Sequence, residues 1–184
     1  SLRAAERVQF GCDFWKFVGQ QGSGEQSGIG GTGVITIGSL LGMAAHLEGK
    51  GVSVLDMTGM SQKNGSVSSH VRIAAHPQAI RAQRIASGEA DLVLGCDMVV
   101  VNDYWALSKI RADRSHVVLN DYQAMPGTFT RNTDLQFPAK DIVAAVSTAL
   151  GGREPLQIAG TELALALMGD AIATNLLMLG YAWQ

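Results

Sequence analysis

The chain has little cysteine, and that shortage excludes several kinds of site. Of its 184 residues only Cys12 and Cys96 are cysteines, and they lie far apart without forming a Cys-x-x-Cys pair. A zinc site or an iron–sulfur cluster therefore cannot be built from the cysteines of this chain alone. Two isolated thiols are compatible with a reducing cytoplasm, and no signal-peptide pattern opens the sequence. We expect a cytoplasmic protein.

Charge is also scarce, and neither sign dominates. Charged residues make up 16% of the chain, and the formal net charge is −2. A nucleic-acid-binding surface or a surface for anionic membranes needs clustered lysine and arginine, which this sequence does not offer. We therefore expect no nucleic-acid partner and no membrane partner.

Apolar residues and glycine, by contrast, are abundant: 47% of the chain is hydrophobic and 22 residues are glycine. This length and composition fit one α/β domain with buried strands and many tight turns. We expect helices over residues 34–47, 80–87, 98–110 and 138–150, and strands over residues 52–57, 66–74, 90–95 and 117–119. Strands and helices that alternate at these spacings predict a Rossmann-like, mostly parallel sheet with helices on both faces.

The N-terminal residues show no such regularity. Residues 20–27 form a polar, glycine-containing run, whereas a dinucleotide-binding fold places an apolar strand directly before its first glycine. We expect an irregular segment over residues 1–27 and a single domain over residues 28–184.

The first glycines of that domain form a G-x-G-x-x-G pattern, Gly28-Ile29-Gly30-Gly31-Thr32-Gly33. Glycine tolerates positive φ in a tight turn and lets backbone N–H groups approach a ligand. The N-terminus of the following helix favours a phosphate or a carboxylate. The same pattern also occurs where a glycine turn only packs a helix closely against a sheet, so both interpretations stay open.

The strand expected over residues 66–74 has two different faces. Period-two alternation places Val67 and Val71 on one face, and Ser66, Ser68, His70 and Arg72 on the other. Central parallel strands are normally apolar on both faces. The polar face therefore indicates either an edge strand in contact with solvent or a surface that meets a ligand or partner. His70 taken alone is more typical of a structural histidine than of a catalytic base.

The last stretch, residues 161–184, is strongly apolar, and Asp170 is its only charge after Leu163. A membrane span is interrupted by Gly169-Asp170 and Thr174-Asn175, so two buried helices, or one helix bent at Gly169, are expected instead. Helices this apolar require cover from the domain's own sheet or from another domain.

Three polar segments are expected at one edge of the sheet. Ligands of open α/β sheets bind outside the carboxyl ends of the strands. The glycine loop 28–33, the polar loop 58–65 and Asn120-Asp121 each follow an expected strand or open a helix at that edge. Their clustering is a stronger indication of a site than any one of them.

Several segments, in this order, resemble the gamma domain of the 2-oxoacid:ferredoxin oxidoreductases. The resemblance begins with GIGGTGV at residues 28–34, LGMAAHLEGKGV at 41–52, SQKNGSV at 61–67 and SHVRI at 69–73. EADLVLGCD at residues 89–97 and GDAIATN at 169–175 are similar to the fused indolepyruvate:ferredoxin oxidoreductases in particular. The resemblance runs from about residue 28 to the C-terminus, and it departs at residues 1–27.

The resemblance implies a part of an enzyme rather than a whole one. Members of the family oxidise a 2-oxo acid on thiamine diphosphate with Mg, transfer the acyl group to coenzyme A, and pass electrons through iron–sulfur clusters to ferredoxin. Those cofactors belong to other domains or subunits, both thiamine-binding and ferredoxin-like, so this chain is expected to bind none autonomously and to be inactive alone. A homo-oligomer of this chain is left open as a further assembly.

The resemblance also implies which residues face a cofactor. The gamma domain covers the active-site region and is similar to domains that close over coenzyme A. No general base or nucleophile is expected. The residues expected near cofactors or catalytic domains are Gly28, Gly30, Gly31, Thr32, Gly33, Ser61, Gln62, Lys63, Asn64, Ser68, His70 and Arg72.

Two other functions fit parts of the sequence. An NAD-dependent dehydrogenase domain would use Asp56, at the end of the second strand, to bind ribose, although its distance from the first glycine is long for that pattern. A non-catalytic assembly domain would use the polar strand and the apolar C-terminus only to dock other subunits.

Overall fold

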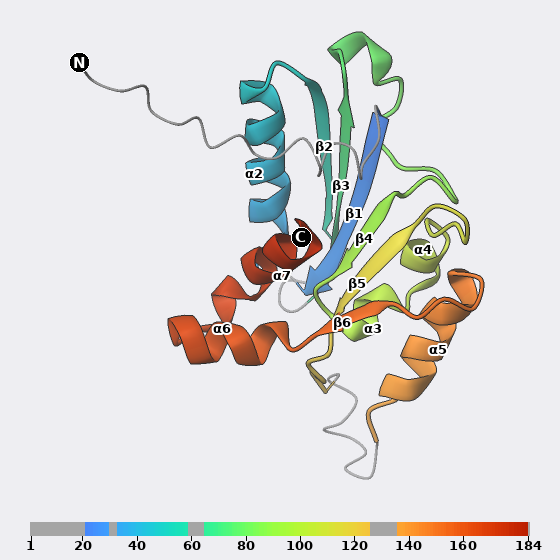
Figure 1. Ribbon diagram of the computed structural model, residues 1–184, viewed down its shortest axis with the longest axis vertical. Coiled ribbons are helices and arrows are strands. Elements are labelled where there is room, and N and C mark those ends of the chain that lie inside the picture. The colour runs from blue at the N-terminus through green and yellow to red at the C-terminus, as the bar shows by residue number, and fades with distance from the viewer. Residues whose placement is uncertain (1–20, 30–32, 59–64, 126–135, 184) are drawn as a thin grey trace.

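The computed structural model describes residues 21–29, 33–58, 65–125 and 136–183. Within these residues six strands form one sheet in the order β2-β3-β1-β4-β5-β6, with helices on both faces (Figure 1). The elements in chain order are β1 (Gln21–Ile29), α2 (Val34–Leu47), β2 (Gly51–Thr58), β3 (Ser66–Ala74), η1 (Pro77–Ala79), β4 (Leu92–Gly95), α3 (Met98–Val101), α4 (Tyr104–Leu107), β5 (His116–Asn120), α5 (Ala139–Ala149), β6 (Leu156–Ile158), α6 (Gly160–Met168), η3 (Ala171–Ala173) and α7 (Thr174–Trp183). The expected α/β architecture is confirmed.

The sequence analysis expected no strand before the first glycine, and this was wrong. β1 covers Gln21–Ile29 and lies in the middle of the sheet, antiparallel to β3 and parallel to β4. The sequence analysis missed β1 because its sequence is polar, whereas apolar periodicity is the main signal for a buried strand. The boundary expected at residue 28 falls inside this strand.

β3 is the one antiparallel strand between parallel neighbours. It pairs with β2 on one side and with β1 on the other, so β2 runs parallel to β1. The polar face of β3 therefore does not arise from an edge position, and the edge alternative is wrong. What covers that face has to be found elsewhere in the chain.

One face of the sheet packs against α2 and α7 (Figure 1). Ile37 of α2 and Met178 of α7 are completely buried against β4 and β5. Gly38 brings α2 close to the sheet, since a Cβ there would lie 2.7 Å from Ser69 Oγ. The helix expected over residues 34–47 is confirmed to the residue, and Gly49 follows it with a φ of 71°.

The opposite face packs against α3, α4 and α5 (Figure 1). Asp97 caps α3, because its Oδ1 accepts a hydrogen bond of 3.0 Å from Val100 N. The helix expected through residue 110 is divided into the two short helices α3 and α4. The three consecutive valines 99–101 favour helix weakly, which is consistent with an early end. α5 agrees with the expected helix that begins at Pro138.

The helix expected over residues 80–87 is wrong. After η1 the chain runs over the polar face of β3 without regular structure until β4. Side chains of β3 bind the backbone carbonyl groups of Ala82 and Arg84 and the N–H of Ile85. These are the groups that a helix would pair internally, so the tertiary hydrogen bonds compete with helix formation.

The apolar C-terminal stretch forms two helices, as expected, but the expectation that both are buried was wrong, because Leu167 and Met168 of α6 are each 69% exposed. Gly169 ends α6 in the left-handed region with a φ of 73°, and η3 leads into α7. Among the described residues, no helix combines the length and the hydropathy that crossing a membrane requires.

Candidate functional site

The expected meeting of polar segments at one sheet edge is confirmed for their described parts. β1, β2, β4, β5 and β6 are mutually parallel through their ladders, so their carboxyl ends share an edge with the start of β3. Ser27, Ser68 and Met57 lie opposite one another in neighbouring strands near this edge. Asn120 ends β5 at the same edge.

A cavity of about 260 Å³ opens beside this edge, on the face that bears the polar residues of β3. We call it the carboxyl-edge pocket. Strands β1, β2 and β3 provide its floor, with Ser27, Met57, Ser66, Ser68 and His70. Its walls come from the segment before β4 and from the region of α3 and α4. The wall residues are Arg84, Val100, Asp103, Trp105, Ala106 and Lys109, and Thr58 and Val67 complete the lining.

Three of the floor residues bear hydroxyl groups, and two of them, Ser27 and Ser68, differ in exposure. Ser27 is 1% exposed, and its Oγ has no hydrogen-bond partner among the described residues. Ser68, its neighbour across the ladder, is partly exposed. A buried hydroxyl normally finds a partner, because leaving it without one costs free energy. The floor therefore offers a polar group that a ligand can use.

Two cationic side chains line the wall of the pocket, and both lie close to one aromatic ring. The Arg84 guanidinium carbon lies 5.1 Å from the centre of the Trp105 ring, and Lys109 Nζ lies 5.7 Å from it. Lys109 is only 4% exposed. Buried lysines are rare unless an anionic group lies near them, so this pocket is suited to an anion.

His70 is a neutral donor at this pocket. Its Nδ1 accepts a hydrogen bond of 3.0 Å from Ile85 N, which leaves the ring proton on Nε2. Burial is the main cause that lowers the pKa of His70 to about 4, and the positive charges of Lys109, Arg84 and Arg72 lower it further. A neutral histidine held in one tautomer can donate to a ligand but does not act as a base near pH 7.

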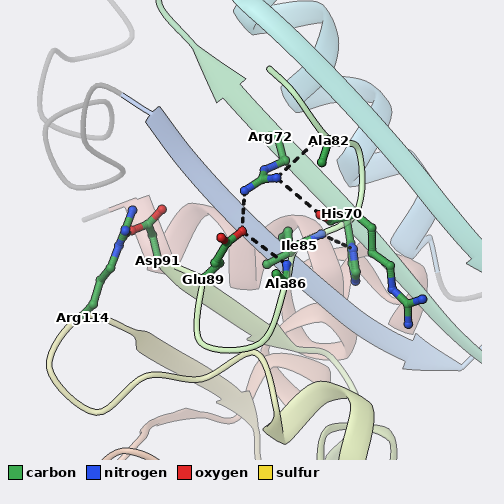
Figure 2. A network of polar contacts seen from close by, with 9 residues as sticks. His70, Arg72, Ala82, Ile85, Ala86, Glu89, Asp91 and Arg114 are labelled. Atoms are coloured by element: carbon green, nitrogen blue, oxygen red, sulfur yellow. Dashed lines mark hydrogen bonds and ion pairs between the residues drawn. The ribbon is translucent and has the colours of Figure 1, made fainter. Parts of the chain in front are cut away.

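Arg72 is engaged with its own chain rather than with the pocket. Figure 2 shows its guanidinium between Glu89 and backbone groups of the segment 80–89, which we call the strap. Arg72 Nη2 lies 2.7 Å from Glu89 Oε2, and Nη1 donates to the carbonyls of Ala82 and Arg84 at 3.2 and 3.4 Å. Together with the bond between His70 and Ile85, these contacts hold the strap on β3.

The predicted cofactor-facing residues are therefore divided. Ser68 and His70 line the pocket, whereas Arg72 is not part of its lining and binds the strap. Gly28 is buried at the end of β1, and Gly33 begins α2 with a φ of 91°. The remaining predictions lie outside the described residues; they are Gly30, Gly31, Thr32, Ser61, Gln62, Lys63 and Asn64.

The sequence analysis missed the pocket's cations. Arg84 lies in the stretch expected as a helix over residues 80–87 and was not singled out, and neither were Lys109 and Trp105. No local pattern joins them, because they come together only when the strap and α4 pack over β3.

A second polar cluster lies at the end of β5. Asn120 Nδ2 donates to Cys96 O at 3.2 Å and to Thr161 Oγ1 at 2.9 Å, and Asn120 Oδ1 accepts from Thr161 N at 3.3 Å. All three residues are buried. Burial raises the pKa of the Cys96 thiol to about 12, so this cysteine is a thiol rather than a thiolate near pH 7. This cluster joins β4, β5 and α6 and has a structural role.

The strand order argues against the dinucleotide-binding alternative. In that fold the strand bearing the ribose-binding acid is the direct neighbour of the first strand. Here β3 lies between β1 and β2, so Asp56 is separated from β1 by a whole strand. Asp56 also faces α2, with its Oδ1 3.7 Å from a Cβ placed on Gly38.

Comparisons with known proteins agree with the resemblance in the sequence. Residues 26–184 match the family described as pyruvate ferredoxin/flavodoxin oxidoreductase. The indolepyruvate oxidoreductase subunit IorB of Methanothermobacter thermautotrophicus is 30% identical over 155 residues, which cover 84% of this chain and 74% of that subunit.

Two solved structures share the fold at lower identity. The gamma subunit of a keto/oxoacid ferredoxin oxidoreductase from Geobacter sulfurreducens has a TM-score of 0.54 and 17% identity, covering 86% of this chain and 73% of that one. The 2-oxoglutarate:ferredoxin oxidoreductase from Magnetococcus marinus, solved with 2-oxoglutarate, coenzyme A and succinyl-CoA, has a TM-score of 0.61 and 19% identity. This match covers 88% of the present chain but only 24% of that larger one. The chain therefore belongs to the pyruvate ferredoxin/flavodoxin oxidoreductase family.

Proposed function

We propose that this chain covers the active site of a thiamine-diphosphate-dependent 2-oxoacid:ferredoxin oxidoreductase and helps to bind the acyl acceptor coenzyme A. Indolepyruvate is the proposed 2-oxo acid, on the strength of the IorB relative. Thiamine diphosphate, Mg and the iron–sulfur clusters belong to other domains or subunits, which also pass electrons to ferredoxin. Cofactors of this kind perform the bond-breaking chemistry, and the protein positions and encloses them.

The observation that carries the proposal is the composition of the carboxyl-edge pocket. Arg84 and Lys109 supply two positive charges, and Ser27, Ser68 and the neutral His70 supply hydroxyl and imidazole groups. Coenzyme A bears several phosphate groups, and phosphates are bound by such combinations of cations and neutral donors. The residues present therefore fit part of this ligand, which would supply the thiol that accepts the acyl group.

Apolar side chains on the outer surface of the C-terminal helices support contact with other domains. Leu167 and Met168 of α6 are each 69% exposed, and Ile172 of η3 and Leu176 of α7 are also exposed. Exposed apolar side chains that gather on one surface are typical of interfaces. We propose that the thiamine-binding or ferredoxin-like partners contact the chain there.

The assembly-only alternative shares this surface but assigns no ligand to the pocket. In the complete enzyme, Lys109→Gln should raise the KM for coenzyme A and leave assembly unchanged. Gel filtration checks assembly, and Lys140→Gln, a change on α5 outside the pocket lining, is the matched control. An unchanged KM for coenzyme A in a correctly assembled Lys109→Gln enzyme would favour the assembly-only function.

A further inference from the structure

We propose that the carboxyl-edge pocket is a phosphate-binding site of this chain itself, formed by Arg84, Lys109, His70 and Ser27. The inference deepens the proposed function and rests on it only for the identity of the compound that carries the phosphate. It concerns residues that neither the glycine pattern nor the family resemblance singled out, apart from His70.

The charges favour an anion. Arg84 and Lys109 are the cations of the lining, and Asp103 is its one carboxylate among the described residues, so the lining has a surplus of positive charge when His70 is neutral. The Lys109 ammonium carries three donor hydrogens. One of them reaches Ser108 Oγ at 3.4 Å, and the ammonium also lies beside the Trp105 ring. An almost buried ammonium in these surroundings is stabilised by an anion.

The number of donors favours a phosphate over a carboxylate. The guanidinium of Arg84 presents a fork of N–H groups, Lys109 adds an ammonium, and Ser27 and Ser68 add hydroxyl groups. A carboxylate has two oxygens to receive them, whereas a phosphate monoester has three that carry charge. Ser27 Oγ, buried and without a hydrogen-bond partner among the described residues, is an independent observation that points to a ligand on the floor.

The strap positions Arg84, one of the two cationic residues that line the pocket. Arg84 belongs to the segment that Arg72 and His70 hold on β3, and the Arg72 Nη1 donates directly to the Arg84 carbonyl. The same strand thus forms the pocket floor with Ser68 and His70 and fixes the backbone that bears a wall residue. The site is therefore built before a ligand arrives, which reduces the entropy lost on binding.

Titration of the purified protein with inorganic phosphate at low ionic strength tests the site, with calorimetry and Trp fluorescence as readouts. We expect saturable binding that weakens about tenfold in Lys109→Gln and in Arg84→Gln, which corresponds to about 1.4 kcal/mol. The matched controls Lys140→Gln and Arg81→Gln change cations outside the lining and should bind phosphate as the parent protein does.

A gain-of-affinity variant keeps the test independent of misfolding. Asp103→Asn removes the pocket's carboxylate, whose side chain makes no capping hydrogen bond to α4, so it should tighten phosphate binding severalfold. Equal affinity for acetate, absence of saturable binding, or weakening by the control variants to the same degree would overturn the phosphate site. If phosphate binds as expected but the variants leave the coenzyme A KM of the complete enzyme unchanged, the site stands and the proposed coenzyme A contact fails.

Discussion

Arg72 and Glu89 form an ion pair with 2.7 Å between Nη2 and Oε2, and this pair joins a central strand to the strap that crosses its polar face. The pair is partly exposed, so its Coulomb energy alone is modest. The same guanidinium also donates hydrogen bonds to two backbone carbonyls of the strap, so Arg72 holds the strap through several contacts at once. A side chain that resembles a ligand-binding arginine in the sequence thus acts as a positioning residue for Arg84.

Arg72→Lys should loosen the strap without unfolding the sheet. Lysine keeps the charge but cannot present the planar fork that reaches a carboxylate and two carbonyls together. We expect a loss of about 1 kcal/mol in the free energy of urea unfolding and faster hydrogen exchange at the Ile85 amide. Arg81→Lys, an exposed change on the same strap, is the control. Unchanged exchange at Ile85 in Arg72→Lys would show that Arg72 does not hold the strap.

Protein stability should fall as the pH drops below 6.5 because of His70. Its pKa is about 4 in the folded chain against 6.5 ordinarily, since burial and the charges of Lys109, Arg84 and Arg72 oppose the charged form. Above pH 6.5 the ring is neutral in both states. Between pH 6.5 and 4 the unfolded chain takes up a proton that the folded chain does not, so unfolding becomes easier by as much as about 3 kcal/mol.

Urea unfolding at pH 7.5, 6, 5 and 4 measures this dependence. In His70→Asn the amide oxygen can still accept from Ile85 N, but the titration is removed, so the dependence on pH in this window should shrink. A smaller dependence should remain, because burial also lowers the pKa of His116. Parent and variant curves of equal slope between pH 6.5 and 4 would contradict the assignment to His70.

Two glycines should respond in opposite directions to alanine. A Cβ on Gly95 would lie 2.4 Å from Val101 Cγ2 and 2.7 Å from Leu119 Cδ2, so Gly95→Ala overpacks the junction between β4, β5 and α3. We expect a loss of about 1–3 kcal/mol in unfolding free energy. Gly180 lies in α7, and a Cβ there would meet no heavy atom within 4 Å, so Gly180→Ala should gain about 0.5–1 kcal/mol. Thermal unfolding of both variants checks the signs.

The Asn120 cluster should matter for stability rather than for ligand binding. Asn120→Ala leaves the Cys96 carbonyl and the Thr161 backbone N–H without their buried partner, at a cost of about 2–3 kcal/mol. Asn102→Ala, at an exposed asparagine, is the control and should be nearly neutral. Phosphate affinity equal to that of the parent protein at a temperature where Asn120→Ala is folded would confirm the division of roles.

What could be predicted from the sequence depended on how local the determining interactions are. α2, α5 and the break at Gly169 follow from residues within a few positions of each element, and they were expected correctly. β1 was missed because its sequence lacks the apolar pattern expected of a central strand. Its place in the sheet comes from backbone hydrogen bonds to the neighbouring strands. The strap was expected as a helix because the residues that prevent the helix, His70 and Arg72, lie at least ten positions away from their partners, on β3.

The candidate site shows the same limit. Sequence reasoning placed the polar segments at the carboxyl edge, because parallel strands place their ends together, and Ser68 and His70, which it named from the alternation within one strand, line the pocket there. It could not join Arg84, Trp105 and Lys109 to them, since that juxtaposition depends on a strap and a one-turn helix packing over the sheet.

The purified chain without other subunits should not oxidise indolepyruvate. Its two cysteines cannot hold an iron–sulfur cluster, and the family resemblance assigns thiamine diphosphate to other domains or subunits. Reduction of a viologen dye by the purified chain with indolepyruvate and coenzyme A measures this, and the complete enzyme is the positive control. Dye reduction by the chain alone would contradict the assignment of catalysis to other domains.

The central claim is that this chain covers chemistry performed elsewhere and contributes a phosphate-binding pocket to it. Steady-state kinetics of the complete enzyme carrying Lys109→Gln, with coenzyme A as the varied substrate, tests this most directly. We predict a KM for coenzyme A that rises about tenfold while kcat and the KM for the 2-oxo acid stay near the parent values. A KM for coenzyme A equal to that of the parent enzyme, with assembly intact, would contradict it.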